Sequence, residues 1–363
     1  MKNNVVLISD AHIKNRLWTN NSLVTGDAYE ALKIISSNLP RDDTTNYLIS
    51  CGDFFDTTRP TSKDLTEAGN FFSNFHRVYY VDGNHDKVDP SLMAIWSERC
   101  VKLTTTPVAI DNLRIFGVDY CSTKEELFEQ LSEISRCVSG YSGSEIPVII
   151  LHQALKEFLG FDGSYTCSCE DLFTMFNTEI NVYCGDIHIS QMYSSDESFV
   201  LSPGPLVPQD IGQAAKDQYW YTLNTFTGKY EKTALKVRDI TIAKTLSEFT
   251  EAISKKPDNR LPCKSLVYAL LPVGVELPKL DENLKQDRII IVRRVSEKAS
   301  NNSVVHRSSN SVSLKDAIIQ DIKDTQKKPD KLVKLASVLI DSTEPDTVLH
   351  TLLTKMGVLN AST

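Results

Sequence analysis

The chain has 363 residues, more than one compact domain usually holds, so its length indicates two domains and a tail. Its formal net charge of −8 argues against a surface coated in basic charge but leaves room for a local groove that binds phosphate. No apolar run is long enough to span a membrane, and the N-terminus passes into a strand pattern without the apolar core of a signal peptide. We therefore expect the eight cysteines to be thiols in a reducing cytoplasm.

The first part of the chain alternates apolar strands with amphipathic helices. The expected elements are a strand at 5–9, a helix at 27–39, a strand at 47–51, a helix at 63–76 and a strand at 77–81. Because strands and helices alternate, we expect parallel strands joined by crossover helices. The elements expected next are short alternating strands between 101 and 120, a helix at 124–138, a strand at 147–151, a helix near 170–176 and a strand at 181–184.

The rest of the chain has a different sequence pattern. Residues 198–202 and 219–223 are predicted to be antiparallel strands, and a rigid proline-rich loop follows the first of them. A helix at 246–254 and strands at 265–271 and 288–292 predict a small α/β unit. The expected domains are a catalytic domain at 1–235, a cap at 236–298, a Ser/Asn-rich linker at 299–312 and a helical segment at 313–363.

Polar side chains follow five of the predicted strands at the point where each strand ends. They are Asp10 and His12, Asp53 and Asp56, the run Asn84, His85 and Asp86, then His152, and finally Asp186 and His188. Four of the seven histidines fall in these clusters, which random placement over a surface would not produce. Because the carboxyl ends of parallel strands meet at one edge of a sheet, we expect one common site.

The residue types in these clusters predict a site for two metal ions. Oxygen and imidazole groups without a thiolate favour manganese, magnesium or iron over a structural zinc. Two cations about 4 Å apart need a bridging carboxylate to offset their repulsion, and Asp53 in Gly-Asp-x-x-Asp is the natural candidate. Such a pair would lower the pKa of a bridging water and hold both oxygens of an in-line phosphoryl displacement.

The ordered set Asp-x-His, Gly-Asp-x-x-Asp, Gly-Asn-His-Asp, His and Gly-x-x-His resembles the calcineurin-like metallophosphoesterase superfamily over about residues 5–190. Within it the chain is similar to the SbcD-type nuclease subunits, which are related to a double-strand-break repair nuclease and to the small subunits of phage recombination endonucleases. The closer features are Thr58-Arg59-Pro60, Leu151-His152-Gln153 and Ser202-Pro203-Gly204-Pro205. The resemblance implies an α/β fold, a four-layer α/β/β/α metallophosphoesterase sandwich with a small α/β cap and C-terminal helices.

The resemblance also implies a role for each clustered residue. One metal ion would be held by Asp10, His12, Asp53 and His188, and the other by Asp53, Asn84, His152 and Asp186. His85 would face the phosphate or the leaving group, and Asp86 would orient the His85 imidazole through its second ring nitrogen. Asp56 would support these ligands or lie on the phosphate side. The expected cofactors are two divalent ions, Mn²⁺ in the first place and Mg²⁺ as the alternative.

One position departs from the family pattern. The last block of the family usually reads Gly-His-x-His, whereas this chain has Gly185-Asp186-Ile187-His188. An aspartate can still bind a hard cation, and the ligands would then include three carboxylates. The alternative is a weakened or lost second metal, which would leave a non-catalytic scaffold with the same fold.

Substrate and partners are indicated less directly. Candidate contacts to a DNA backbone are Arg59 and the basic residues between 229 and 244, among them Lys236 and Arg238. The alternative is that the residues between 229 and 244 form a strand face exposed to solvent. The resemblance implies exonuclease activity on duplex DNA and endonuclease activity on single strands, in DNA repair, recombination and replication. A phosphomonoesterase or a cyclic-nucleotide phosphodiesterase is the alternative enzyme.

The implied partners, besides DNA, are an SbcC-like SMC-type coiled-coil ATPase and a second copy of the chain. Two apolar stripes at helical spacing between 332 and 356 predict a helix pair that docks on the ATPase, and a tail that folds back on its own domain is the alternative. The implied location is the cytoplasm of a bacterium or of a phage-infected host, away from any membrane.

Overall fold

The structure is a computed structural model that describes residues 3–16, 18, 21–40, 45–141, 145–159, 167–195, 198–258, 260–278, 280 and 282–295. The chain divides into two compact units after Val295, and every described residue lies in the first. The predicted linker at 299–312 and the helical segment at 313–363 lie outside the described residues. Within the described ranges, no helix combines the length and the apolar character needed to cross a membrane.

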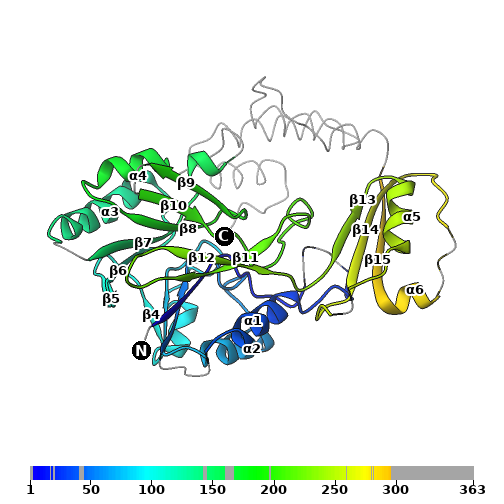
Figure 1. Cartoon of the computed structure of the whole chain (residues 1–363), viewed down its shortest axis with the longest axis horizontal. Coiled ribbons are helices and arrows are strands. Elements are labelled where there is room, and N and C mark those ends of the chain that lie inside the picture. Colours follow the sequence, from blue (N-terminus) through cyan, green and yellow to red (C-terminus); the bar gives the residue numbers. More distant parts are fainter. Residues whose placement is uncertain are drawn as a thin grey trace, which may run out of the picture. The chain divides into compact units, whose positions relative to one another are not determined.

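A first six-stranded sheet carries the N-terminal strands (Figure 1), in the order β12-β11-β1-β2-β3-β4. Its strands are β1 (Asn4–Ile8), β2 (Asn46–Ser50), β3 (Arg77–Tyr80), β4 (Cys100–Lys102), β11 (Gln218–Leu223) and β12 (Tyr230–Leu235). Strands β1 to β4 run parallel, and β11 and β12 are antiparallel additions at one edge. Helices α1 (Asp27–Ser37) and α2 (Ser62–Phe72) connect the first three strands, so the predicted β-α-β-α-β alternation is confirmed.

A second six-stranded sheet has the order β5-β6-β7-β8-β10-β9. Its strands are β5 (Val108–Ile110), β6 (Leu113–Val118), β7 (Ile146–His152), β8 (Asn181–Gly185), β9 (Gln191–Ser195) and β10 (Ser198–Ser202). The four central strands are parallel, and helices α3 (Lys124–Val138) and α4 (Cys169–Met175) connect three of them. Both strands predicted near 200 and 220 exist, but they lie in different sheets. β11 is antiparallel to both of its neighbours, as predicted, whereas β10 is antiparallel to β9 and parallel to β8.

Strand β1 illustrates how the two sheets pack. Val5 and Leu7 join an apolar cluster that also contains Ile115 and Val148 of the second sheet. The alternate residues Val6 and Ile8 pack instead in the cluster formed with α1 and α2. A strand that is buried on both faces has a continuous apolar sequence, as this one does.

The second sheet is covered in the same way on its outer face. Leu127 and Leu131 of α3 and Leu172 of α4 pack against Phe116 and Val182 of its strands. Figure 1 shows α1 and α2 on one side of the sheets and α3 and α4 on the other. The layers are therefore helix, sheet, sheet and helix, which confirms the predicted four-layer sandwich.

The predicted small α/β unit follows the sandwich and is drawn in yellow-green to orange in Figure 1. Its sheet has the order β13-β14-β15, all parallel. The elements are β13 (Ile240–Ala243), α5 (Leu246–Ser254), β14 (Ser265–Pro272), α6 (Glu282–Asp287) and β15 (Arg288–Val295). Phe249 of α5 is fully buried against the sheet, which gives this cap a small core of its own.

Arg238, which the sequence suggested as a DNA contact, is 5% exposed and joins the cap to the sandwich. Its Nε lies 2.8 and 2.9 Å from the two carboxylate oxygens of Asp27, the first residue of α1. The guanidinium also donates to the carbonyl oxygens of Thr25 and Lys264. The prediction that Arg238 contacts DNA is therefore wrong, because its guanidinium is buried and already bound within the protein. Lys236 and Arg59 are on the surface and stay candidates.

Removing one partner of this buried ion pair leaves the other charge without compensation. We expect Arg238→Met to lower the free energy of unfolding by about 3–5 kcal/mol. The double variant Asp27→Leu/Arg238→Met, which removes both charges, is expected to recover most of that loss. Urea unfolding followed by circular dichroism measures both values. An Arg238→Met protein that unfolds like the wild type but binds DNA less tightly would make Arg238 a DNA contact after all.

Candidate metal centre

The five predicted clusters meet at one edge of the sandwich, because β1, β2 and β3 of one sheet and β7 and β8 of the other end there. Main-chain hydrogen bonds hold the loops together. The amide of His12 donates to the carbonyl oxygen of Asp53 at 3.0 Å, and the amide of Asp186 donates to Asp10 Oδ1 at 3.0 Å. The second bond crosses from one sheet to the other, so the two sheets share one site.

The backbone at this edge is held in an unusual conformation. Positive φ angles occur at Asp10 (47°), His12 (40°), Asp53 (48°) and Asp186 (75°). Among the described residues, Asp111 is the only other non-glycine residue with a positive φ. Such conformations cost about 1–3 kcal/mol each and persist only where the surrounding structure enforces them. Strain of this kind is concentrated at functional sites, and here it aims the side chains of the clusters at one point.

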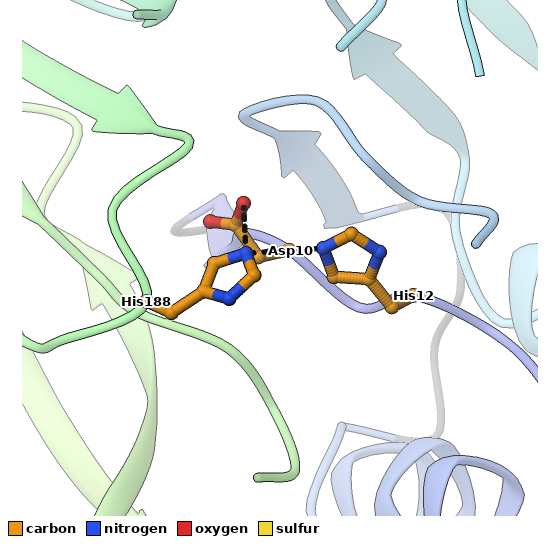
Figure 2. Close-up of side chains that lie close together, drawn as sticks. All are labelled: Asp10, His12 and His188. Atoms are coloured by element: carbon orange, nitrogen blue, oxygen red, sulfur yellow. Dashed lines mark hydrogen bonds and ion pairs between the residues drawn. The ribbon is translucent and has the colours of Figure 1, made fainter. Parts of the chain in front are cut away.

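Three of the side chains form a first group, and Figure 2 shows the carboxylate of Asp10 and the rings of His12 and His188 turned toward one another. The Nε2 atoms of His12 and His188 are 3.2 Å apart, and His188 Nε2 is 3.6 Å from Asp10 Oδ1. Asp53 completes this group, since its Oδ2 lies 3.5 Å from His12 Nε2. These are the four residues expected around the first ion.

A second group surrounds His152, the last residue of β7. Its Nε2 lies 3.1 Å from Asn84 Oδ1, 3.4 Å from Asp53 Oδ2 and 3.9 Å from Asp186 Oδ1. These are the four residues expected around the second ion, and Asp186 makes the longest approach. The same oxygen of Asp53 therefore faces both groups, as a bridging carboxylate would.

The donor set fits hard divalent cations. Asp10 and His152 are fully buried, and Asp53 is 1% exposed. In the described part of the chain, the carboxylates of Asp10, Asp53 and Asp186 pair only with histidines and with no lysine or arginine. Buried carboxylates without a permanent cation are costly, and a bound divalent ion would remove that cost. Three overlapping groups have spacing suited to an ion: Asp10, His12 and His188; His12, Asp56 and His85; and Asp10, Asp53 and His152.

The charges of the site shift its pKa values strongly. Burial alone would lower the pKa of His152, but the carboxylates of Asp53, Asp10 and Asp186 raise it to about 10. Burial would raise the pKa of Asp10, but the imidazoles of His188, His152 and His12 hold it below its usual range. The site therefore favours a protonated His152, and a cation that binds there must displace that proton.

Two of the histidines have an acceptor at their second ring nitrogen. His152 Nδ1 is 2.8 Å from the carbonyl oxygen of Cys51. His12 Nδ1 is 3.3 Å from Asp56 Oδ1, an ion-pair contact whose angle is poor for a hydrogen bond, and Lys14 Nζ lies 2.7 Å from the same oxygen. Acceptors at Nδ1 favour a proton there and leave Nε2 free to bind a metal. Asp56 therefore contacts His12, and no sequence motif identified Lys14.

The structure corrects the role expected for Asp86. Its carboxylate is buried and accepts from the main-chain amides of Gly83 (2.8 Å), Phe54 (2.7 Å) and Phe55 (3.3 Å). His85 Nδ1 lies instead 3.0 Å from the carbonyl oxygen of Asp56. The prediction that Asp86 orients His85 is therefore wrong, because Asp86 fastens the loop after β2 to the loop after β3. The exposed ring of His85 packs edge-on against His12, with centroids 4.8 Å apart.

Two motif glycines allow the close packing of these loops. A Cβ atom at Gly83 would lie 2.1 Å from Asp53 Oδ1. A Cβ atom at Gly185 would lie 2.2 Å from the carbonyl oxygen of Cys51 and 2.5 Å from His152 Nδ1. Any larger residue would displace the shared carboxylate or the buried histidine, which explains the glycines that precede Asn84 and Asp186.

Comparisons with known proteins agree with this geometry. The sequence matches the family model of the calcineurin-like phosphoesterases over residues 4–190, and the chain belongs to this family. It is thus a hydrolase of the metallophosphoesterase class, and its described residues include candidate metal-binding groups.

A curated relative extends the comparison beyond the family domain. The DNA double-strand break repair protein Mre11 of Sulfurisphaera tokodaii is 23% identical over 310 residues, which cover 77% of this chain and 75% of the relative. Two solved structures show weaker likeness. The phosphopantetheinyl hydrolase PptH of Mycobacterium tuberculosis has a TM-score of 0.35 and 12% identity, over 56% of this chain and 89% of that one. The phosphoesterase YfkN of Bacillus subtilis has a TM-score of 0.36 and 10% identity, over 64% and 90%.

Replacing Asp186, the aspartate that departs from the family pattern, should change the melting temperature in a direction that depends on pH and on bound divalent ions. Burial, with the charges of Asp10 and Asp53 and against the effect of His152, raises the pKa of Asp186. Ionising it therefore destabilises the metal-free fold as the pH rises from about 4, where an unfolded aspartate ionises. In EDTA, Asp186→Asn should raise the melting temperature at about pH 8 and change it little at about pH 4.

Divalent ions should reverse the order of the melting temperatures of the wild type and Asp186→Asn. If Asp186 is a ligand, Mn²⁺ stabilises the wild type more than Asp186→Asn, because binding to the folded state alone adds stability. Thermal unfolding in EDTA and in Mn²⁺ measures both effects, and Asp111→Asn is the matched control because Asp111 shares the positive φ but lies outside the site. Equal stabilisation of wild type and Asp186→Asn by Mn²⁺ would exclude Asp186 as a ligand.

Proposed function

We propose that this chain is a metal-dependent DNA phosphodiesterase, an exonuclease on duplex DNA and an endonuclease on single strands. One observation carries the two-metal part of the proposal. Asp53 Oδ2 lies 3.5 Å from His12 Nε2 and 3.4 Å from His152 Nε2, so one carboxylate oxygen is shared by two groups of ligands. A site with two ions of this kind suits the in-line displacement at a phosphodiester.

The residues that would hold the ions come from both sheets. The first ion would be bound by Asp10, His12, Asp53 and His188, and the second by Asp53, Asn84, His152 and Asp186. When bound, the two ions would supply Lewis-acid stabilisation of the charge on the phosphoryl oxygens. Mn²⁺ is the proposed metal and Mg²⁺ the alternative, because every donor is an oxygen or an imidazole nitrogen.

His85 is the residue proposed to act on the substrate directly. Its ring is exposed beside His12, and His85 is not one of the seven residues expected to bind the two ions. Its Nδ1 donates to the carbonyl oxygen of Asp56, so a proton on Nε2 makes the ring a cation. Such a ring can donate a hydrogen bond or a proton to the phosphate or to the leaving oxygen.

DNA is proposed as the substrate on the strength of the sequence. The SbcD-type features and the similarity to Mre11 over 77% of the chain both support it. Arg59 and Lys236 are the proposed contacts to the phosphate backbone, and both side chains are on the surface. We further propose that residues 313–363 dock on a coiled-coil ATPase of the SbcC type, as the SbcD-type resemblance implies.

The experiment compares three substrates with the purified chain in Mn²⁺: DNA, a nucleotide monoester and a cyclic nucleotide. We expect DNA to be cleaved fastest. His85→Ala should lose about 10²–10⁴-fold of that rate, the usual contribution of a positioned acid, while its bound Mn²⁺ is unchanged. His76→Ala is the matched control, because His76 is also exposed but contacts Tyr47 at the amino ends of β2 and β3, away from the site at their carboxyl ends.

Two outcomes would overturn the proposal. Faster hydrolysis of the monoester or of the cyclic nucleotide would assign the site to one of those substrates. Absence of any Mn²⁺-dependent hydrolysis, with the protein folded, would indicate a scaffold that keeps the fold without the chemistry. Full activity of His85→Ala would remove that residue from the mechanism but leave the substrate assignment in place.

A further inference from the structure

The side chain of Lys14 lies at the edge of the metal centre and belongs to neither group of expected ligands. Its Nζ is 2.7 Å from Asp56 Oδ1, and the same oxygen is 3.3 Å from Nδ1 of His12. The main-chain carbonyl oxygen of Asp56 lies 3.0 Å from Nδ1 of His85. Asp56 therefore connects the ammonium of Lys14 to an expected ligand of the first ion and to the residue proposed to act on the phosphate.

The backbone next to Lys14 is fixed by the loop that carries Asp56. The main-chain amide of Ile13 donates to the carbonyl oxygen of Phe54 at 2.9 Å, and Ile13 pairs with Phe55 in a parallel bridge. Ile13 is 1% exposed, so its side chain anchors the loop in the core. The ammonium is thus placed beside Asp56 by the pairing of two loops, and a ligand that binds it meets a group that is already ordered.

The position of Lys14 is also notable for what lies around its partner. His12, Asp56 and His85 form one of the three groups with spacing suited to an ion, and their candidate ligand atoms lie within 4.8 Å of one another. The two-ion scheme assigns no ion to this group. The ammonium of Lys14 is bound to one of its members, so a positive charge is already present there. A fixed cation beside two metal positions suits a phosphate, whose negative charge is spread over several oxygens.

The ammonium has donors left for a substrate. It carries three N–H bonds, and among the described residues Asp56 is its single hydrogen-bond partner. The side chain of Lys14 is 27% exposed, so it is partly held by the protein and partly open to solvent. A phosphate oxygen accepts hydrogen bonds and is negatively charged, which makes it a suitable partner for the remaining donors.

We propose that Lys14 binds a phosphate oxygen of the substrate at the metal centre and that Asp56 is the positioning residue that holds the Lys14 ammonium there. This contact rests on the proposed function, in which the site cleaves a phosphodiester. The competing role for Lys14 is only to offset the charge of Asp56, which alone would repel a phosphate. The two roles differ in what happens when both charges of the pair are removed together.

The first test measures binding to DNA without cleavage. A labelled duplex is titrated with the protein by fluorescence anisotropy at several KCl concentrations, with Ca²⁺ in place of Mn²⁺, and a gel verifies that the DNA stays intact. Each phosphate contact adds about 0.9 to the slope of log affinity against log salt for duplex DNA. We expect Lys14→Met to lower that slope by about 0.9 and to weaken binding about tenfold at low salt, whereas Lys14→Arg stays near the wild-type values.

Two comparisons separate a phosphate contact from charge neutralisation. Lys124→Met is the matched control, because Lys124 also pairs with an aspartate, Asp171 at 3.2 Å, but lies on α3. The double variant Lys14→Met/Asp56→Asn removes both charges of the pair and leaves the net charge unchanged. If Lys14 binds the phosphate, the double variant keeps the reduced slope. A return of the double variant to the wild-type slope would overturn the proposal.

The second test follows hydrolysis in Mn²⁺. We expect Lys14→Met to raise KM about tenfold with little change in kcat, because the contact is made with the bound substrate as well as with the transition state. Thermal unfolding and Mn²⁺ content are measured for each variant, and for Lys14→Met both should match the wild type. Loss of bound Mn²⁺ with an unchanged salt slope would instead make Lys14 a support for His12, and the proposal would fail.

The outcomes separate this proposal from the proposed function. If the wild type hydrolyses the nucleotide monoester and not DNA, the proposed function fails, while the KM of Lys14→Met for the monoester still decides whether Lys14 binds phosphate. If the wild type cleaves DNA but Lys14→Met keeps both the wild-type slope and the wild-type KM, the role of Lys14 is refuted and the proposed function remains.

Discussion

The carboxylate of Asp53 is the group on which the rest of the site depends. One oxygen accepts the amide of His85 at 2.9 Å and so holds the loop after β3 against the loop after β2. The other faces His12 from the first sheet and His152 from the second. A single buried side chain thus contacts loops that belong to both sheets of the sandwich. Its position is set by a left-handed backbone and by Gly83, which has no Cβ to displace it.

This arrangement costs stability that the fold must supply elsewhere. Four residues of the site adopt positive φ angles, and three carboxylates lie close together without a lysine or arginine partner among the described residues. The apolar clusters on both faces of each sheet provide the compensating burial, and strands such as β1 are buried on both sides. A site of this kind is expected where function, rather than folding, selects the residues.

Much of the site could be predicted because its signal is local. Each cluster directly follows an apolar strand, and the parallel order of the strands brings their ends together. The helix at 124–138 was predicted at the bounds it has, since its apolar spacing and its Thr123 cap are both local features. The residues of the two groups follow from the same reasoning, together with the resemblance of their order to a known family.

The features that sequence could not reveal depend on distant contacts. Arg238 lies in a basic stretch that has the composition of a solvated face, but its partner Asp27 is 211 positions away. The sequence paired Asp86 with its neighbour His85, whereas its carboxylate accepts from the main-chain amides of Phe54 in the preceding loop and of Gly83 in its own loop. Lys14 belongs to no motif, and only the fold brings its ammonium to Asp56, 42 positions away. Strands β10 and β11 are near in sequence, yet the connection between them passes from one sheet to the other.

The central claim is that Asp53 joins two divalent ions in one centre, and electron paramagnetic resonance of the Mn²⁺-loaded protein tests it most directly. Two Mn²⁺ ions that share a carboxylate are exchange-coupled, so the account predicts two ions per chain and a coupled spectrum that Asp53→Asn converts to signals of isolated Mn²⁺ or abolishes. A wild-type spectrum of a single uncoupled Mn²⁺ per chain, unchanged by Asp53→Asn, would contradict the account.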